Sequence, residues 1–202
     1  MKLNLPNKLS ISRIIITILI IFLLLFPFDL INVSFPVYDL KGVELDIKLV
    51  MAGMLFIIGS LTDFLDGMIA RKYNLITDFG KTVDAIADKA LVSSSLIILA
   101  GIGMVNPLVP AVIVFRDIVV DAIKMQSAAK GKVVAAIKSG KIKTTVQMIG
   151  TSLVFFGNLP FSLFGLELGN LLLYIAVILA IWSMIEYYTL NKEIIFDKKE
   201  TK

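Results

Sequence analysis

Asp63-Phe64-Leu65-Asp66-Gly67-Met68-Ile69-Ala70-Arg71 is the stretch that decides how this chain folds, and Gly80, Asp84 and Asp88 continue it. The four aspartates lie within and beside apolar runs, where an ionised side chain is costly unless something compensates its charge. The first two are three residues apart and share one face of a helix. The glycine and the last two aspartates are spaced by four and share one face of the next helix. If these faces turn toward each other, the four carboxylates converge on one point.

Such a convergence of carboxylates predicts a metal site. Two like charges ~4 Å apart repel by about 4 kcal/mol at an effective dielectric of ~20, so the cluster needs cations or protons. The chain has no histidine and no cysteine, so its ligands are hard oxygens, which favour Mg²⁺ or Mn²⁺ over zinc, copper or iron. A pair of such ions can clamp both oxygens of an in-line displacement at phosphorus. Buried ion pairs, or the proton relay of a transporter, are the alternative interpretations.

The composition predicts a polytopic membrane protein. Of the 202 residues, 57% are hydrophobic, and the mean hydropathy is +0.89, whereas soluble domains average roughly 45–50% apolar residues. The absence of cysteine excludes disulfides and leaves the redox compartment undefined. The net charge of +4 is spread along the chain rather than over one groove, so we expect no nucleic-acid partner.

Hydropathy predicts an all-α fold, a single membrane domain over 1–202 with six transmembrane helices after an N-terminal interfacial amphipathic helix. The interfacial helix is expected at 1–12, with Asn7 as its N-cap, the six spans within 13–190 and a polar tail at 191–202. The expected spans are 13–33, one from about 49 through Asp63 and Asp66, one from about Gly80 to Gly101, 107–127, 144–160 and 168–188.

The length of the second span places the aspartates at the membrane edge. Its uncharged part, Leu49 to Thr62, covers about 21 Å of a ~30 Å hydrocarbon core, so the helix must continue into Asp63 and Asp66. The first span has no small-x-small cleavage site after it, so we expect it to be retained.

The basic residues predict the orientation of the chain. With six spans both termini fall on one side, and that side carries nearly all of the lysines and arginines; only Lys41 and Lys48 fall on the other. By the positive-inside rule, the termini and the aspartates face the cytoplasm. We expect an integral protein of a cell membrane, and specifically of a bacterial plasma membrane.

Written as D-x2-D-G-x2-A-R-x8-G-x3-D-x3-D, the deciding stretch resembles the signature of the CDP-alcohol phosphotransferases, integral membrane enzymes of phospholipid synthesis. Every fixed position of the signature is filled. The resemblance implies that Asp63, Asp66, Asp84 and Asp88 form the metal site, with the first three as the metal ligands. It implies that Asp88 lies beside the metals and is the general base that takes the proton of the acceptor hydroxyl. It also implies a homodimer.

The resemblance further implies a site for the CDP part of the donor lipid, made by Asn7, Ser10, Arg13, Asp63, Gly67, Arg71 and Gly80. Asn7-x-x-Ser10-x-x-Arg13 resembles an N-terminal Asn-x-x-Thr-x-x-Arg of the family, and its spacing puts all three on one helical face. An N-cap followed by an interfacial arginine is the alternative. The two glycines can admit a nucleotide, or serve tight helix packing instead. Arg71 is expected to bind a phosphate of the CDP moiety. The alternative is an arginine whose side chain extends to the membrane surface to keep its charge in water.

Arg116, Lys141 and Lys143 are the candidates for binding a phosphate on the acceptor. Arg116 falls about nine residues inside the fourth predicted span, where a solvated charge is hard to explain. Gly140-Lys141-Ile142-Lys143-Thr144 is similar to the phosphatidylglycerophosphate synthase branch of the family, whose acceptor is glycerol 3-phosphate and whose donor is CDP-diacylglycerol. Inositol phosphate, serine or phosphatidylglycerol as the acceptor, and a metal or proton-coupled transporter, remain as alternatives. The loop lysines are expected to meet anionic bilayer lipids.

Overall fold

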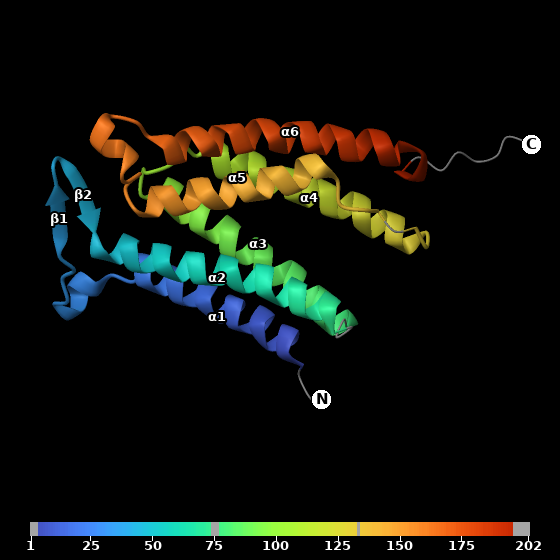
Figure 1. Ribbon diagram of the computed structural model, residues 1–202, viewed down its shortest axis with the longest axis horizontal. Helices are drawn as coiled ribbons and strands as arrows, with labels where there is room; N and C mark the ends of the chain where they lie inside the picture. Colours follow the sequence, from blue (N-terminus) through green and yellow to red (C-terminus); the bar gives the residue numbers. More distant parts are fainter. Residues whose placement is uncertain (1–3, 74–76, 133, 196–202) are drawn as a thin grey trace, which may run out of the picture.

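The computed structural model describes residues 4–73, 77–132 and 134–195, with a few side chains inside these ranges, Arg71 among them, left out of the description (Figure 1). The described elements are α1 Leu5–Leu25, η1 Phe28–Ile31, β1 Val37–Leu40, β2 Val43–Asp46, α2 Ile47–Lys72, α3 Asp78–Gly101, α4 Leu108–Ala129, α5 Lys138–Phe155, η2 Phe161–Phe164 and α6 Leu168–Ile195. The protein is therefore mainly helical, as its hydropathy predicts.

The helices form two groups of three. In the N-terminal group α1 packs against both α2 and α3, and in the C-terminal group α6 packs against both α4 and α5. The groups meet along a seam where α2 contacts α5 and α3 contacts α4. The start of α1 and the end of α6 lie at one end of the molecule, and the β-hairpin lies at the other (Figure 1).

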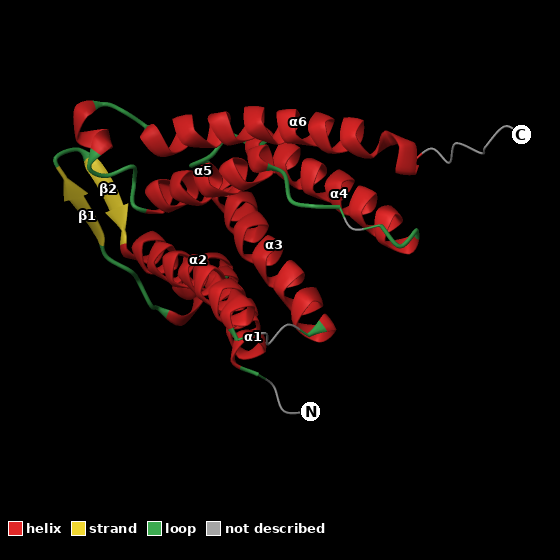
Figure 2. Ribbon diagram, turned by 45° about the vertical axis from the view of Figure 1, so that its right-hand side comes forward, coloured by secondary structure: helices red, strands yellow, loops and turns green. Residues whose placement is uncertain are grey.

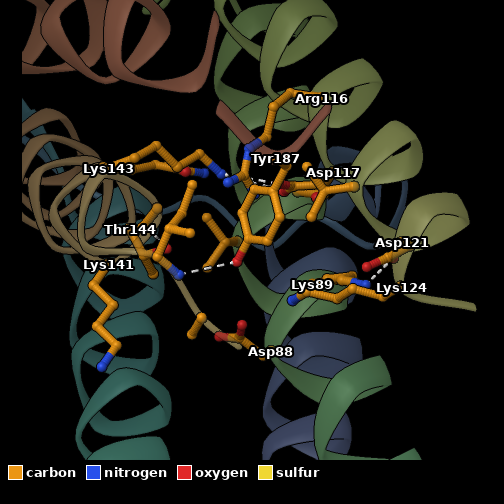
Figure 3. A pocket seen from close by; sticks show the side chains of 17 residues that line it. Asp88, Lys89, Arg116, Asp117, Asp121, Lys124, Lys141, Lys143, Thr144 and Tyr187 are labelled. Atoms are coloured by element: carbon orange, nitrogen blue, oxygen red, sulfur yellow. Dashed lines mark hydrogen bonds and ion pairs between the residues drawn. The ribbon is translucent and has the colours of Figure 1, made fainter. Parts of the chain in front are cut away.

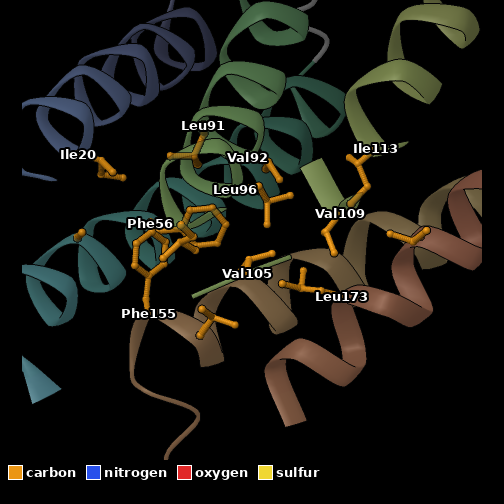
Figure 4. Packing of buried hydrophobic residues seen from close by; sticks show 14 of the residues in the cluster. Ile20, Phe56, Leu91, Val92, Leu96, Val105, Val109, Ile113, Phe155 and Leu173 are labelled. Carbon is orange, nitrogen blue, oxygen red and sulfur yellow. The ribbon is translucent and has the colours of Figure 1, made fainter. Parts of the chain in front are cut away.

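One hydrophobic core joins the two groups. It contains Phe56 of α2 and Phe155 of α5, whose ring centroids are 5.6 Å apart, together with Leu96 of α3 and Leu173 of α6 (Figure 4). Helices α5 and α6 come especially close where Gly150 faces Gly169, because a Cβ on either glycine would lie 3.0 Å or less from the carbonyl oxygen of the other. Small residues at such crossings are typical of helix packing in membranes.

The outer surface of the bundle is apolar. Large hydrophobic side chains are exposed along every helix, among them Ile18, Phe115, Ile178 and Trp182. A soluble monomer rarely exposes so continuous an apolar surface. Within the described residues, three stretches are long and apolar enough to cross a membrane, namely Leu5–Leu25, Ile47–Ile69 and Leu168–Lys192.

The N-terminus differs from the sequence prediction. The structure has one continuous helix, Leu5–Leu25, so the prediction of a separate interfacial helix over 1–12 is not confirmed. The N-cap is Asn4, whose side chain accepts a hydrogen bond from the backbone N–H of Asn7; assigning the cap to Asn7 was wrong. Nothing breaks the helix near residue 12, and Pro27 ends it earlier than the predicted boundary at 33.

The predicted polar loop after the first helix contains a β-hairpin. Strands β1 and β2 pair antiparallel around Lys41 and Gly42, which both have positive φ angles (Figure 2). Two such residues form the tight turn that matches the twist of a hairpin. The other predicted spans correspond to α2, α3, α4 and α6, whereas α5 begins at Lys138, earlier than the predicted 144.

Candidate active site

The first part of the site is the face of α1 that carries Asn7, Ser10 and Arg13, all three of them buried. Asn7 Nδ2 donates to Thr77 Oγ1 at 3.3 Å, and Thr77 caps α3 by accepting a hydrogen bond from the backbone N–H of Gly80. A Cβ at Gly80 would lie 2.4 Å from Asn7 Oδ1. Glycine at this position therefore lets α1 approach the start of α3, which supports the packing interpretation of Gly80.

The second part is a cluster of three aspartates. Asp63 and Asp66 on α2 and Asp84 on α3 each offer a carboxylate oxygen, and these oxygens all lie within 4.8 Å of one another. The spacing of three along α2 turns both of its aspartates toward α3, as the sequence predicts. We refer to Asp63, Asp66 and Asp84 as the aspartate cluster.

Arg13 reaches into the aspartate cluster from α1. Its NH1 lies 2.8 Å from Asp63 Oδ1 and 3.4 Å from Asp84 Oδ1, and its NH2 lies 2.5 Å from Asp66 Oδ2. The arginine is fully buried. Ser10 Oγ lies 3.3 Å from Asp66 Oδ2 and 3.5 Å from Asp84 Oδ1, so α1 also supplies a hydroxyl to the cluster.

The aspartate cluster fits a divalent cation. Three carboxylates around one guanidinium leave an excess of two negative charges, and all the ligand atoms are hard oxygens, which Mg²⁺ and Mn²⁺ prefer. Asp66 is buried, but the side chains of Asp63 and Asp84 remain 34% and 46% exposed. An ion that keeps several of its waters can therefore reach the cluster.

The third part is a cavity of about 200 Å³ at the seam between the two helix groups (Figure 3). Asp88, one helical turn beyond Asp84 on α3, lies on its wall rather than in the aspartate cluster. The other charged or aromatic residues of the wall are Lys89, Arg116, Asp117, Asp121, Lys124, Lys141, Lys143 and Tyr187. The cavity thus joins a carboxylate of the N-terminal group to cations of the C-terminal group.

The cations of the cavity are organised by Asp117. Arg116 NH1 lies 3.0 Å and Lys143 Nζ 3.1 Å from Asp117 Oδ1, and both basic residues are buried. Arg116 Nε donates to Ser183 Oγ at 3.0 Å, and the guanidinium lies over the ring of Tyr187. We refer to Arg116, Asp117 and Lys143 as the basic cluster.

The structure thus brings Arg116 and Lys143 together, whereas Lys141 lines the same cavity with an exposed side chain that Figure 3 shows pointing away from them. Gly67 lies on α2 directly after Asp66. The backbone at Arg71 is helical, but its side chain lies outside the described part of the chain.

Sequence reasoning missed several residues of the cavity wall. Asp117 and Tyr187 lie on the wall and contact Arg116, and Lys89 and Asp121 form an ion pair there (Figure 3). Ser183, which does not line the cavity, accepts a hydrogen bond from Arg116 Nε. The one available signal was that Arg116 and Asp117 are adjacent charges inside an apolar run. Their partners lie far away in the sequence, so only the packing of the helices reveals them.

Comparison with known proteins agrees with this geometry. The family model described as CDP-alcohol phosphatidyltransferase matches residues 3–182. The chain is 40% identical over 195 residues to the protein of Bacillus subtilis (strain 168) named CDP-diacylglycerol–glycerol-3-phosphate 3-phosphatidyltransferase, covering 94% of this chain and 96% of that relative. Relatives of the same name from Rickettsia felis (33% identical; 94% and 96% covered) and Haemophilus influenzae (33% identical; 98% of both chains covered) match equally completely. The chain belongs to the CDP-alcohol phosphatidyltransferase family.

Proposed function

We propose that this enzyme transfers the phosphatidyl group of CDP-diacylglycerol to the primary hydroxyl of sn-glycerol 3-phosphate and releases CMP. The observation that carries the proposal is the cavity, which places Asp88 and the basic cluster on walls of one space beside the aspartate cluster. The relatives' names give the same donor and acceptor. A phosphorylated acceptor suits this cavity, because the basic cluster has two cations for one carboxylate.

The donor binds at the aspartate cluster. When bound there by Asp63, Asp66 and Asp84, two Mg²⁺ or Mn²⁺ ions stabilise the charge that develops on the diphosphate of the donor. Asn7, Ser10, Arg13, Gly67, Arg71 and Gly80 are proposed to surround the CDP part. The diacyl chains remain in the bilayer, since the cluster lies at the end of apolar helices.

Asp88 is the proposed general base. It lies one turn from Asp84 and faces the cavity, so a hydroxyl held in the cavity can be near both the base and the diphosphate. Asp88 takes the hydroxyl proton while the oxygen forms a bond to the phosphorus of the phosphatidyl group. The bond from that phosphorus to the oxygen of CMP breaks, and CMP leaves with the electron pair.

The basic cluster is proposed to hold the acceptor phosphate. Arg116 offers a planar set of N–H donors, and Lys143 adds a point charge that Asp117 keeps in place. Lys141 is exposed at the cavity mouth and attracts the acceptor. A space of about 200 Å³ suits a small acceptor better than a diacyl lipid such as phosphatidylglycerol.

We further propose that all six helices span the membrane and that the aspartate cluster faces the cytoplasm. The charged side chains of α3, α4 and α5 gather at the end where α1 begins and α6 ends, which leaves their remaining lengths apolar. The concentration of lysine and arginine at this end supports the orientation.

CMP release by the purified protein tests the function directly. CDP-diacylglycerol and Mg²⁺ are supplied with glycerol 3-phosphate, inositol phosphate, serine or phosphatidylglycerol in separate reactions. We expect CMP with glycerol 3-phosphate alone, loss of activity on chelation, and recovery with Mg²⁺ or Mn²⁺. CMP with a different acceptor would refute the acceptor assignment and keep the chemistry. Metal flux into proteoliposomes without CMP from any acceptor would favour a transporter instead.

A further inference from the structure

Arg13 forms ion pairs with all three carboxylates of the aspartate cluster, which a residue that only binds a nucleotide has no need to do. Its two terminal nitrogens approach all three carboxylates, at 2.8 Å from Asp63, 2.5 Å from Asp66 and 3.4 Å from Asp84. The side chain is fully buried, and its ion pairs join α1 to both α2 and α3. The three carboxylates that it contacts are the group that fits a metal ion.

We propose that Arg13 is an internal counter-cation of the aspartate cluster, which holds α2 and α3 together and lowers the affinity of the cluster for divalent cations. The inference rests on the proposed metal-dependent function. It adds a role for a residue of this chain that the resemblance places only beside the nucleotide.

The structural half of the role follows from electrostatics. Three carboxylates within 4.8 Å repel one another, and the burial of Asp66 makes that repulsion stronger than it would be in water. Arginine remains protonated under all ordinary conditions, so its charge is permanent. A permanent cation among the carboxylates keeps the ends of α2 and α3 close, whether or not a metal ion is bound.

The competitive half follows from the atoms involved. Arg13 engages Oδ1 of Asp63, Oδ2 of Asp66 and Oδ1 of Asp84, which leaves the second oxygen of each carboxylate for an ion. An ion bound there lies close to a fixed like charge, and it also shares the carboxylates with the guanidinium. Removing the positive charge of residue 13 should therefore tighten metal binding and at the same time lower the stability of the metal-free protein.

The test measures Mn²⁺ binding to the purified protein without substrates, by the electron paramagnetic resonance signal of free Mn²⁺, and thermal unfolding in a chelator and in saturating Mn²⁺. For Arg13→Gln we expect a Kd for Mn²⁺ lower by at least about fivefold, the effect of one like charge removed at close range. We also expect a lower Tm in the chelator that Mn²⁺ largely restores. Arg13→Lys keeps the charge and should bind Mn²⁺ like the wild type.

Arg116→Gln serves as the matched control, because Arg116 is the other buried arginine among the described side chains and does not touch the aspartate cluster. It should leave the Kd for Mn²⁺ unchanged. Unchanged or weaker Mn²⁺ binding by Arg13→Gln would overturn the proposal. So would an equal loss of Tm with and without Mn²⁺, which would indicate a packing role.

A double variant covers the case in which Arg13→Gln does not fold. Arg13→Gln combined with Asp63→Asn removes one negative charge together with the positive one. We expect this variant to be more stable in the chelator than Arg13→Gln alone. If the second substitution brings no recovery, charge balance is not the role of Arg13. None of these measurements uses CMP release, so the acceptor assay on the wild type judges the proposed function separately.

Discussion

The two helix groups each hold a charged cluster, and the clusters have opposite signs. The aspartate cluster has three carboxylates around one arginine, whereas the basic cluster has two cations around one aspartate. In both, a residue of opposite charge lies inside and leaves a net charge for a ligand. The aspartate cluster is suited to cations and the basic cluster to an anion, and the cavity at the seam is lined by the basic cluster and by Asp88, one helical turn from Asp84.

The comparison also shows how one bundle can hold two kinds of substrate. Charges of one sign gathered in a single site would either repel the phosphates or fail to retain the metals. Separate clusters on different helix groups avoid this conflict, because each charge is balanced by its own neighbours. In the proposed reaction the two substrates meet at Asp88, which lies on α3 and lines the cavity.

The largest expected effect is at this meeting point. Asp88→Asn should lower kcat by about 10²–10⁴-fold, because the hydroxyl loses its proton acceptor while the aspartate cluster is intact. Single-turnover CMP release measures the loss, and binding of CDP-diacylglycerol should be retained. Asp29→Asn, an exposed aspartate in η1 at the hairpin end, is the matched control and should behave as the wild type. Turnover by Asp88→Asn at the wild-type rate would remove Asp88 from the mechanism.

The next largest effect concerns the KM values of the two substrates, which test whether each cluster binds its own substrate. Arg116→Ala should raise the KM for glycerol 3-phosphate by about 10–100-fold, since a charge-assisted hydrogen bond contributes about 1.5–3 kcal/mol. The KM for CDP-diacylglycerol should change little, because that substrate is proposed to bind in the other helix group. Initial rates at varied concentrations of each substrate provide the check. A rise in both KM values would mean that the clusters are not separate sites.

A smaller effect concerns the internal charge of the basic cluster. Asp117→Asn leaves the buried Lys143 without its carboxylate, and we expect a loss of about 2–3 kcal/mol in the free energy of unfolding. Asp121→Asn breaks the half-exposed pair with Lys89 and should cost less than about 1 kcal/mol. Chemical denaturation in detergent compares the two variants. Equal losses would contradict the view that Asp117 holds the cluster together.

The smallest effect is expected at the cavity mouth. Lys141 is exposed, so Lys141→Ala should raise the KM for glycerol 3-phosphate by less than about fivefold, in keeping with the 0–1 kcal/mol of exposed charge interactions. Because such a contribution is screened by salt, the difference from the wild type should vanish at high ionic strength. An effect as large as that of Arg116→Ala would place Lys141 inside the basic cluster.

The pattern of residues 63–88 predicted much of the first cluster. Spacings of three and four fix which side chains share a helical face, and the apolar runs fix where the helices lie. The convergence of Asp63, Asp66 and Asp84 could therefore be expected, as could the position of Ser10 and Arg13 on one face of α1. The hairpin could also have been predicted, because Lys41-Gly42 separates two short runs with β-strand propensity. Hydropathy alone did not predict it.

The basic cluster could be predicted from the sequence only in part. Arg116 stood out as a charge inside an apolar run, but its hydrogen-bond partner Ser183 comes from α6, and Lys143, which shares Asp117 with it, comes from α5. Lysines in a basic loop look alike in sequence, so nothing distinguished the buried Lys143 from the exposed Lys141. Only the packing of α4 and α5 on α6, which brings Lys143 to Asp117, separates them.

By itself the sequence determined the membrane character, the helices and the oxygen ligands of the aspartate cluster, because composition and helical periodicity are local properties of the chain. The tertiary structure decided the rest: that Arg13 lies within the aspartate cluster, that Asp88 lines a cavity, and that Asp117 joins Arg116 to Lys143. The physical reason is that a buried charge takes whichever partner the packing brings within reach, and packing depends on contacts between residues far apart in the chain.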